Sequence, residues 1–312
     1  MGILSFLGFC KNFPLTSIDP DGATDLRPRP DYVWAQGLEG FAYGKTNNEG
    51  YNNAHDYKRG MSIDVLVMGA SHMEGYQVQM EDNTSSLLSK ISKLKVYNIG
   101  ASRHYLLTCL CNLQSATEKY NPSKYIVIET GSVKIPDKML KMAEASTFPE
   151  VEDAKNRGTL RFLLRENMYL RLLWGKATHI ISKYTQSNKD KDTFFNDSEI
   201  MLRLLRQAEE TASSCGAKLI IAYHPSVSLN KDGTLKINGD PEIVKQFSDL
   251  CAENGIYFLN MAGRFLEEYK NNYILPYGFA NTSVGKGHMN RDGHRMFADE
   301  IYALIKRIEA ES

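Results

Sequence analysis

Short apolar runs alternate with amphipathic segments over residues 62–310, and this alternation limits the fold more than any other feature of the chain. The run Tyr125–Glu129 (YIVIE) is typical of a strand buried on both faces. The segment Tyr105–Tyr120 instead repeats apolar residues at helical spacing. We therefore predict an α/β protein with a parallel sheet covered on both faces by helices. The predicted strands are Ile63–Met68, Lys95–Ile99, Tyr125–Glu129, Leu219–Tyr223 and Ile256–Leu259.

Helices are predicted between these strands and after the last one. Asn83 to Ser86 offer capping side chains ahead of Leu87 and Leu88. Further helices are expected over Tyr105–Tyr120, Ser198–Ser213, Pro241–Glu253 and Asp292–Ala310. Residues 1–60 are rich in Pro, Gly and Asn and predict a loop-rich extension, which its tyrosines and Trp34 should pack on the body. Residues 134–195 predict a helical insertion into the α/β domain of residues 61–312.

Composition excludes several classes of function. Lysine plus arginine equals aspartate plus glutamate, 37 each, so no net charge draws the chain to nucleic acid or an anionic membrane. The N-terminal MGILSFLGFC is too short to span a bilayer and lacks the basic start of a signal peptide. The five cysteines show no C-x-x-C spacing and predict no disulfide framework. We expect a soluble chain, either cytoplasmic or exported by a segment upstream of this sequence.

Serine, glycine and histidine residues collect where the predicted strands end. In parallel sheets, ligands bind outside the carboxyl ends of the strands. A serine hydroxyl becomes a nucleophile when a histidine takes its proton, and backbone N–H groups then stabilise the oxyanion. The sequence therefore predicts acyl transfer at this edge. The segments concerned are Gly69-Ala70-Ser71-His72, Gly100, Glu129-Thr130-Gly131-Ser132, His224 and Gly287–His294.

These segments resemble the sequence blocks of the SGNH, or GDSL-type, hydrolases. The first block of that family reads roughly G-D-S, matched by Gly69-Ala70-Ser71, and its second block supplies a glycine, matched by Gly100. The last block, D-x-x-H before a helix, is matched by His288. The resemblance implies a flavodoxin-like three-layer fold and an esterase, lipase, or carbohydrate O-acetyl hydrolase or transferase activity without a cofactor. By this match Ser71 is the nucleophile, His288 is the general base, and the N–H groups of Ser71 and Gly100 bind the oxyanion.

Three positions depart from the family pattern. Ala70 replaces the aspartate of the first block. The third block lacks its asparagine, and loss of one oxyanion donor costs on the order of 3 kcal/mol. Gly285 stands where an aspartate would orient His288. Substitutes for the oxyanion donor could be Glu129, Thr130 or Ser132, and Asp292 or a backbone carbonyl could orient the imidazole.

Alternative interpretations remain open at this point. Ser71 could be a structural turn residue and His288 an ordinary loop residue. His72 and Asn290 could line the pocket, and His224 could contact a ligand or cap a loop. His294 is expected to be structural because it lies inside the last helix. Neither a metal site nor a glycine-rich nucleotide site is supported by residue spacing.

The leading hypothesis is an esterase for an acylated carbohydrate or other small ester. The alternatives are an O-acetyltransferase and a glycan-binding module that has lost catalysis.

Overall fold

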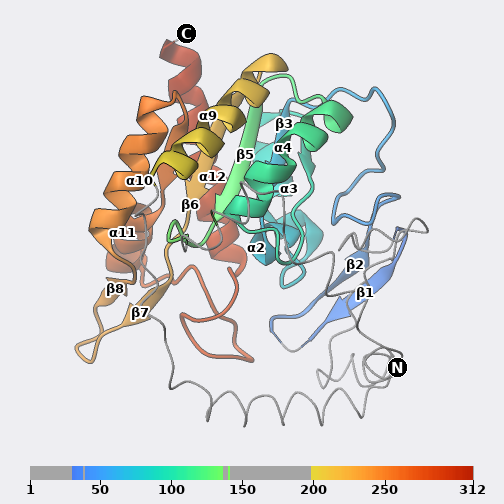
Figure 1. Cartoon of the computed structure of the whole chain (residues 1–312). Coiled ribbons are helices and arrows are strands. Elements are labelled where there is room, and N and C mark those ends of the chain that lie inside the picture. The colour runs from blue at the N-terminus through green and yellow to red at the C-terminus, as the bar shows by residue number, and fades with distance from the viewer. Residues whose placement is uncertain (1–29, 38, 136–139, 141–197, 312) are drawn as a thin grey trace, which may run out of the picture.

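A five-stranded parallel sheet forms the centre of the molecule in the computed structural model, which describes residues 30–37, 39–135, 140 and 198–311 (Figure 1). The strands lie in the order β4-β3-β5-β6-β9. This order confirms the predicted fold class, since it is the flavodoxin-like arrangement in which the chain reverses its direction of travel between the first and third strands. The strands are β3 (Val65–Met68), β4 (Val96–Asn98), β5 (Tyr125–Thr130), β6 (Lys218–Tyr223) and β9 (Tyr257–Asn260).

Helices cover both faces of this sheet, as the continuous apolar strands predicted. One layer contains α4 (Leu106–Tyr120), α9 (Ser198–Ser214) and α10 (Pro241–Glu253). The other contains α3 (Thr84–Ser92), α11 (Ala262–Asn272) and α12 (Arg291–Glu311). Figure 1 shows α4 and α9 in front of the sheet and α12 behind it.

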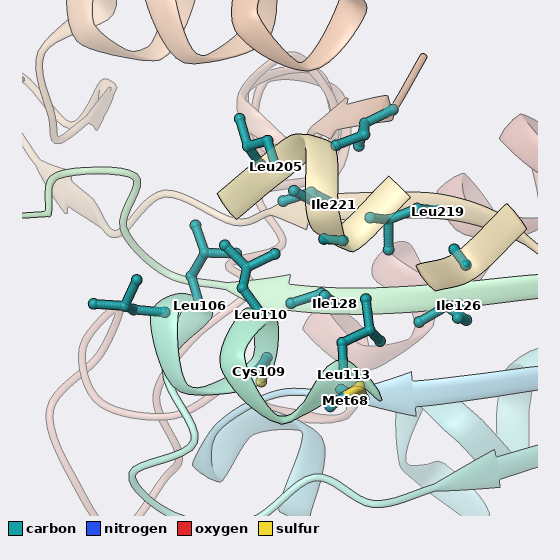
Figure 2. Close-up of a cluster of buried hydrophobic side chains, with 14 of the residues drawn as sticks. Met68, Leu106, Cys109, Leu110, Leu113, Ile126, Ile128, Leu205, Leu219 and Ile221 are labelled. Atoms are coloured by element: carbon teal, nitrogen blue, oxygen red, sulfur yellow. The ribbon is translucent and has the colours of Figure 1, made fainter. Parts of the chain in front are cut away.

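Alternate residues of each strand enter opposite cores because successive side chains point to opposite faces. Ile126 and Ile128 of β5 pack against α4 and α9 (Figure 2), whereas Tyr125 and Val127 pack on the other side with α12. All six residues of β5 are buried. The sheet is packed on both faces, so the residues that follow its strands are held at one edge.

The helix boundaries agree closely with the predictions. Helix α10 spans the predicted residues, and Asn83 caps α3 by accepting a hydrogen bond from the Ser86 N–H at 2.8 Å. Helix α11 was not predicted. The predicted insertion at 134–195 falls mostly on residues outside the described part of the chain.

Two small hairpins lie on either side of the main sheet (Figure 1). Strands β7 (Val227–Leu229) and β8 (Leu235–Ile237) form one, and β1 (Val33–Gln36) and β2 (Ala42–Lys45) form the other. The second hairpin lies inside the segment predicted to be loop-rich. Its strands are only four residues long and are flanked by glycines and asparagines, so composition gave no strand signal. None of the described helices is long and apolar enough to cross a membrane.

Candidate active site

Ser71 lies at the carboxyl end of β3, beside the point where the order of the strands reverses. It is the first residue of the short helix α2 (Ser71–Glu74), and Ala70 is the N-cap of that helix. Gly69 makes the turn with φ of 157° and packs directly against Glu129 and Met73, where a Cβ atom would overlap both side chains. The glycine of the first block is therefore required by packing, and the turn places Ser71 at the edge of the sheet.

His288 faces Ser71 from the loop before α12. Its Nε2 atom lies 2.8 Å from the Ser71 Oγ atom, although the two residues are 217 positions apart in the sequence. The structure thus brings Ser71 and His288 into hydrogen-bond contact. This distance is within the range at which a histidine can accept a serine proton.

Glu39 orients the imidazole of His288, and sequence reasoning missed it. Its Oε2 atom lies 2.7 Å from His288 Nδ1, and its Oε1 atom accepts a hydrogen bond from the His288 N–H at 2.6 Å. A carboxylate can only accept here, so Nδ1 carries a proton and Nε2 is left to accept the proton of Ser71. Ser71, His288 and Glu39 thus have the geometry of a catalytic triad.

The expected substitutes for the missing aspartate do not contact the ring. Asp292 instead accepts a hydrogen bond from Arg295 at 3.1 Å on α12. The Nδ1 atom of His288 is bonded to the Glu39 carboxylate and not to a backbone carbonyl. Glu39 lies 249 residues before His288, in the turn between β1 and β2, and no local motif marks it. Only the fold brings this carboxylate to the site.

Two features hold Glu39 in place. Asn281 donates from Nδ2 to the carbonyls of Gly37 and Gly40, each at 3.0 Å, and accepts from the Gly40 N–H at 2.9 Å. Gly287, with φ of 89°, lies against the Glu39 carboxylate, where any Cβ atom would overlap it. The hairpin turn and the histidine loop therefore fit together through close backbone contacts.

A second carboxylate–histidine pair lies behind the nucleophile. Glu129 and His224 are hydrogen-bonded through Oε1 and Nε2, and their side chains are 1% and 2% exposed. His224 Nδ1 lies 2.8 Å from the Tyr277 hydroxyl, and Glu129 Oε2 accepts a hydrogen bond from the Ala70 N–H at 2.8 Å. The structure thus places Glu129 and His224 in the core beneath the site rather than on its rim.

His72 lies between the two pairs. Its ring centroid is 4.5 Å from that of His224 and 5.1 Å from that of His288. The Met289 N–H donates to His72 Nδ1 at 3.1 Å, so the proton of the neutral ring is on Nε2. Burial, and then the positive charge that His224 and His288 can carry, lower the pKa of His72 well below its usual value. His72 is therefore a neutral spacer between the two pairs.

Other predicted residues use their polar groups in hydrogen bonds within the protein. The Gly100 N–H donates to Asn98 Oδ1 at 2.8 Å, and the Thr130 hydroxyl donates to the Ser132 carbonyl at 2.6 Å. The Ser132 Oγ atom accepts from the Lys134 N–H. Asn290 caps the start of α12 by accepting from the Gly293 N–H at 2.9 Å.

His294 is buried, as predicted for a structural residue. Its Nδ1 atom lies 2.8 Å from the Thr84 hydroxyl and also accepts from the Thr84 N–H. Burial lowers the pKa of His294 to about 3, so its ring is neutral in the folded protein. Within the described part of the chain, no three His, Cys, Asp or Glu side chains are grouped to hold a metal ion.

Comparison with known proteins gives likeness at the level of structure alone. No protein-family model and no curated protein matches the chain. Among solved structures it is similar to TesA, with 13% identity over 78% of this chain and 98% of that one at a TM-score of 0.42. It is also similar to a protein of Slackia heliotrinireducens predicted to be an SGNH hydrolase, with 12% identity over 77% and 97% of the chains and the same TM-score.

A third similar structure is the acetyl xylan esterase AlAXEase, with 12% identity, 77% and 99% coverage, and a TM-score of 0.43. The salicylyl-acyltransferase SsfX3 is similar at 10% identity over 81% of this chain and 57% of that one, with a TM-score of 0.41. At these identities the likeness concerns the arrangement of sheet and helices and not the chemistry.

Proposed function

We propose that this protein is a serine-dependent esterase or acyl hydrolase that uses Ser71, His288 and Glu39. One observation carries the proposal: Ser71 Oγ, His288 Nε2, His288 Nδ1 and Glu39 Oε2 form a continuous chain with distances of 2.8 and 2.7 Å between partners. A serine at a strand end has many structural explanations, but this chain of partners matches the requirements for activating a hydroxyl.

In the proposed reaction, Ser71 Oγ attacks the carbonyl carbon of an ester while its proton moves to His288 Nε2. Glu39 stabilises the imidazolium that forms and keeps the ring in the tautomer that the next step requires. His288 then returns the proton to the leaving alcohol as the C–O bond breaks, which leaves an acyl-serine. Water attacks this acyl group with His288 again accepting the proton, and Ser71 is released with the carboxylic acid.

The oxyanion of the intermediate would lie at the start of α2. Ser71 is the first residue of that helix, so its N–H has no partner within the helix and can donate to the oxyanion. The Gly100 N–H would join it only after leaving Asn98 Oδ1, to which it is bonded in the structure. The proposal therefore relies first on the Ser71 amide.

We propose an acylated carbohydrate as the substrate class, with the hairpin of β1 and β2 lining part of the site. Phe41 and Tyr43, on the hairpin that carries Glu39, are 56% and 62% exposed. Exposed aromatic side chains suit the apolar faces of sugar rings.

Transfer of the acyl group to a sugar hydroxyl instead of water would make the same triad an O-acetyltransferase. One of the two arguments for a glycan-binding module without catalysis was the missing aspartate, and the contact of Glu39 with His288 weakens that argument.

The test is hydrolysis of p-nitrophenyl acetate and covalent labelling by a fluorophosphonate probe. Wild-type protein should hydrolyse the ester and take one label on Ser71, and Ser71→Ala should lose both. Ser115→Ala is the matched control, because its exposed hydroxyl bonds only locally to Asn112 on α4. Equal rates of ester hydrolysis for wild type and Ser71→Ala, together with an unlabelled wild type, would favour the binding module over the esterase.

A further inference from the structure

We propose that the buried Glu129–His224 pair is a positioning device that fixes the main chain at Ser71, so that Glu129 acts on catalysis without touching the reacting atoms. This inference deepens the proposed function and rests on it. The observation behind it is that Glu129 Oε2 accepts the hydrogen bond of the Ala70 N–H at 2.8 Å, one residue before the nucleophile.

The main chain that leads to Ser71 is held from both neighbouring strands. On the β5 side, Glu129 binds the Ala70 amide, and on the β4 side, the Ala101 N–H donates to the Gly69 carbonyl at 3.0 Å. Gly69 also lacks the side chain that would push Glu129 away. Two successive residues before Ser71 are therefore anchored in opposite directions, which sets where its Oγ atom lies.

Hydrogen-bond accounting shows how Glu129 is itself held. The Tyr277 hydroxyl lies 2.9 Å from the Pro225 carbonyl and 3.2 Å from the His224 carbonyl, and carbonyls can only accept, so the hydroxyl proton points to them. His224 Nδ1 must then donate to the Tyr277 oxygen. Burial and the Glu129 carboxylate raise the pKa of Tyr277 well above its usual value, so the hydroxyl keeps its proton.

With Nδ1 protonated, one further proton lies between His224 Nε2 and Glu129 Oε1. The pair is then net neutral, whichever atom holds that proton. Every oxygen and nitrogen of the pair has a partner: His224, the Ala70 amide and Tyr277. A buried pair that is fully bonded in this way has one arrangement and little conformational freedom. These properties suit a group that holds the turn before Ser71 in one position.

This pair is separated from the reacting atoms. Ser71 Oγ is bonded to His288, and His72 lies between the rings of His224 and His288. The hydrogen bond that runs from Glu129 toward the nucleophile goes to the backbone of Ala70. A role in positioning explains why an ionisable pair is kept where apolar residues would pack without a desolvation cost.

The variants separate the hydrogen bond to Ala70 from the charge. Glu129→Gln can accept from the Ala70 N–H through Oε1 and donate through its amide to neutral His224, so all the bonds are kept. The double variant Glu129→Met with His224→Leu removes the acceptor but leaves no unpaired buried charge, and such apolar replacements of buried pairs commonly fold well. Glu268→Ala, on α11, is the matched control for loss of another buried carboxylate.

The measurement is kcat and KM on p-nitrophenyl acetate, the rate of fluorophosphonate labelling, and amide exchange at Ala70. The double variant should lose about 100-fold in kcat and in labelling rate with KM little changed, because small displacements of a nucleophile have effects of that size. Its Ala70 amide should exchange much faster than in wild type. Glu129→Gln should stay within about threefold of wild type in rate and keep the amide protected, and Glu268→Ala should keep the wild-type kcat.

A folded double variant with wild-type kcat, labelling rate and Ala70 exchange would overturn the inference. Equal losses in Glu129→Gln and the double variant, with the Ala70 amide still protected in Glu129→Gln, would also overturn it, because charge and not position would then matter. If the wild type itself neither hydrolyses nor labels, the proposed function fails. The exchange of the Ala70 amide then still decides whether the pair fixes the main chain.

Discussion

Two carboxylate–histidine pairs flank His72, one at the site and one in the core beneath it, and they differ in exposure and in what they face. Glu39 and His288 are 14% and 25% exposed, and the free nitrogen of His288 faces the Ser71 hydroxyl. Glu129 and His224 are 1% and 2% exposed, and the remaining nitrogen of His224 faces Tyr277. We propose that the first surroundings let the pair move a proton and that the second hold the pair in place as a support.

Each pair is also matched by a glycine that packs on its carboxylate. Gly287 lies against Glu39 and Gly69 lies against Glu129, and both have positive φ values. Both glycines stand in the sequence blocks that contain Ser71 and His288. The two blocks therefore supply the glycines against which Glu39 and Glu129 pack, although neither block contains these carboxylates.

The largest expected effect is on the Glu39–His288 pair. Glu39→Ala should lower kcat by about 10³-fold to 10⁴-fold, since His288 would lose its orientation and the group that stabilises its charge. Thermal unfolding should change little because the pair is partly exposed. Steady-state kinetics with a melting curve measures both. Gly287→Ala should cause a comparable loss by displacing the carboxylate, and wild-type kcat in both variants would remove Glu39 from the mechanism.

The next effect separates the pairs by stability. Glu129→Ala leaves His224 buried without its partner and should lower the free energy of unfolding by about 3–5 kcal/mol. Glu39→Ala should lower it by about 1 kcal/mol or less. Urea denaturation of the two variants and wild type gives the comparison. Equal losses would mean that exposure does not distinguish the two pairs as described.

A third effect concerns pH and the buried His294. Because the pKa of His294 is lowered to about 3, the unfolded chain binds a proton between about pH 6.5 and pH 3 that the folded protein does not. The free energy of unfolding should therefore fall as pH decreases, by about 1 kcal/mol from this residue between pH 7 and pH 5.5. His294→Asn keeps the acceptor for Thr84 without a titrating ring. Urea midpoints measured over this range should decline less steeply in that variant, and identical slopes would contradict the assignment.

The smallest expected effect concerns the contact of Asn281 with the turn that carries Glu39. Asn281→Ala removes the hydrogen bonds to the turn that carries Glu39, and about 1 kcal/mol of lost bonding corresponds to a kcat lower by about threefold to tenfold. Thr282→Val is the control, because the Thr282 hydroxyl bonds only to Phe279 in its own loop. If both variants behave alike, the turn is held by other contacts.

Apolar periodicity and the residues after the strands were enough to predict the sheet, most helix boundaries, and the pairing of Ser71 with His288. Apolar periodicity is a local property, and the carboxyl ends of parallel strands share one edge, so residues after those strands converge. The oxyanion and acid positions were identified only as departures from a pattern. Nothing local in the segment around Glu39 marks it as an acid of the site.

The pairing of each carboxylate with its histidine could be found only in the folded molecule. Glu39 reaches His288 across 249 residues because a hairpin packs against the loop before α12, and Glu129 and His224 meet because β5 and β6 are neighbours. Both choices depend on contacts between distant segments, and a single sequence carries no record of such contacts. Whether a given Glu–His pair faces a hydroxyl or lies in the core is settled by packing around it.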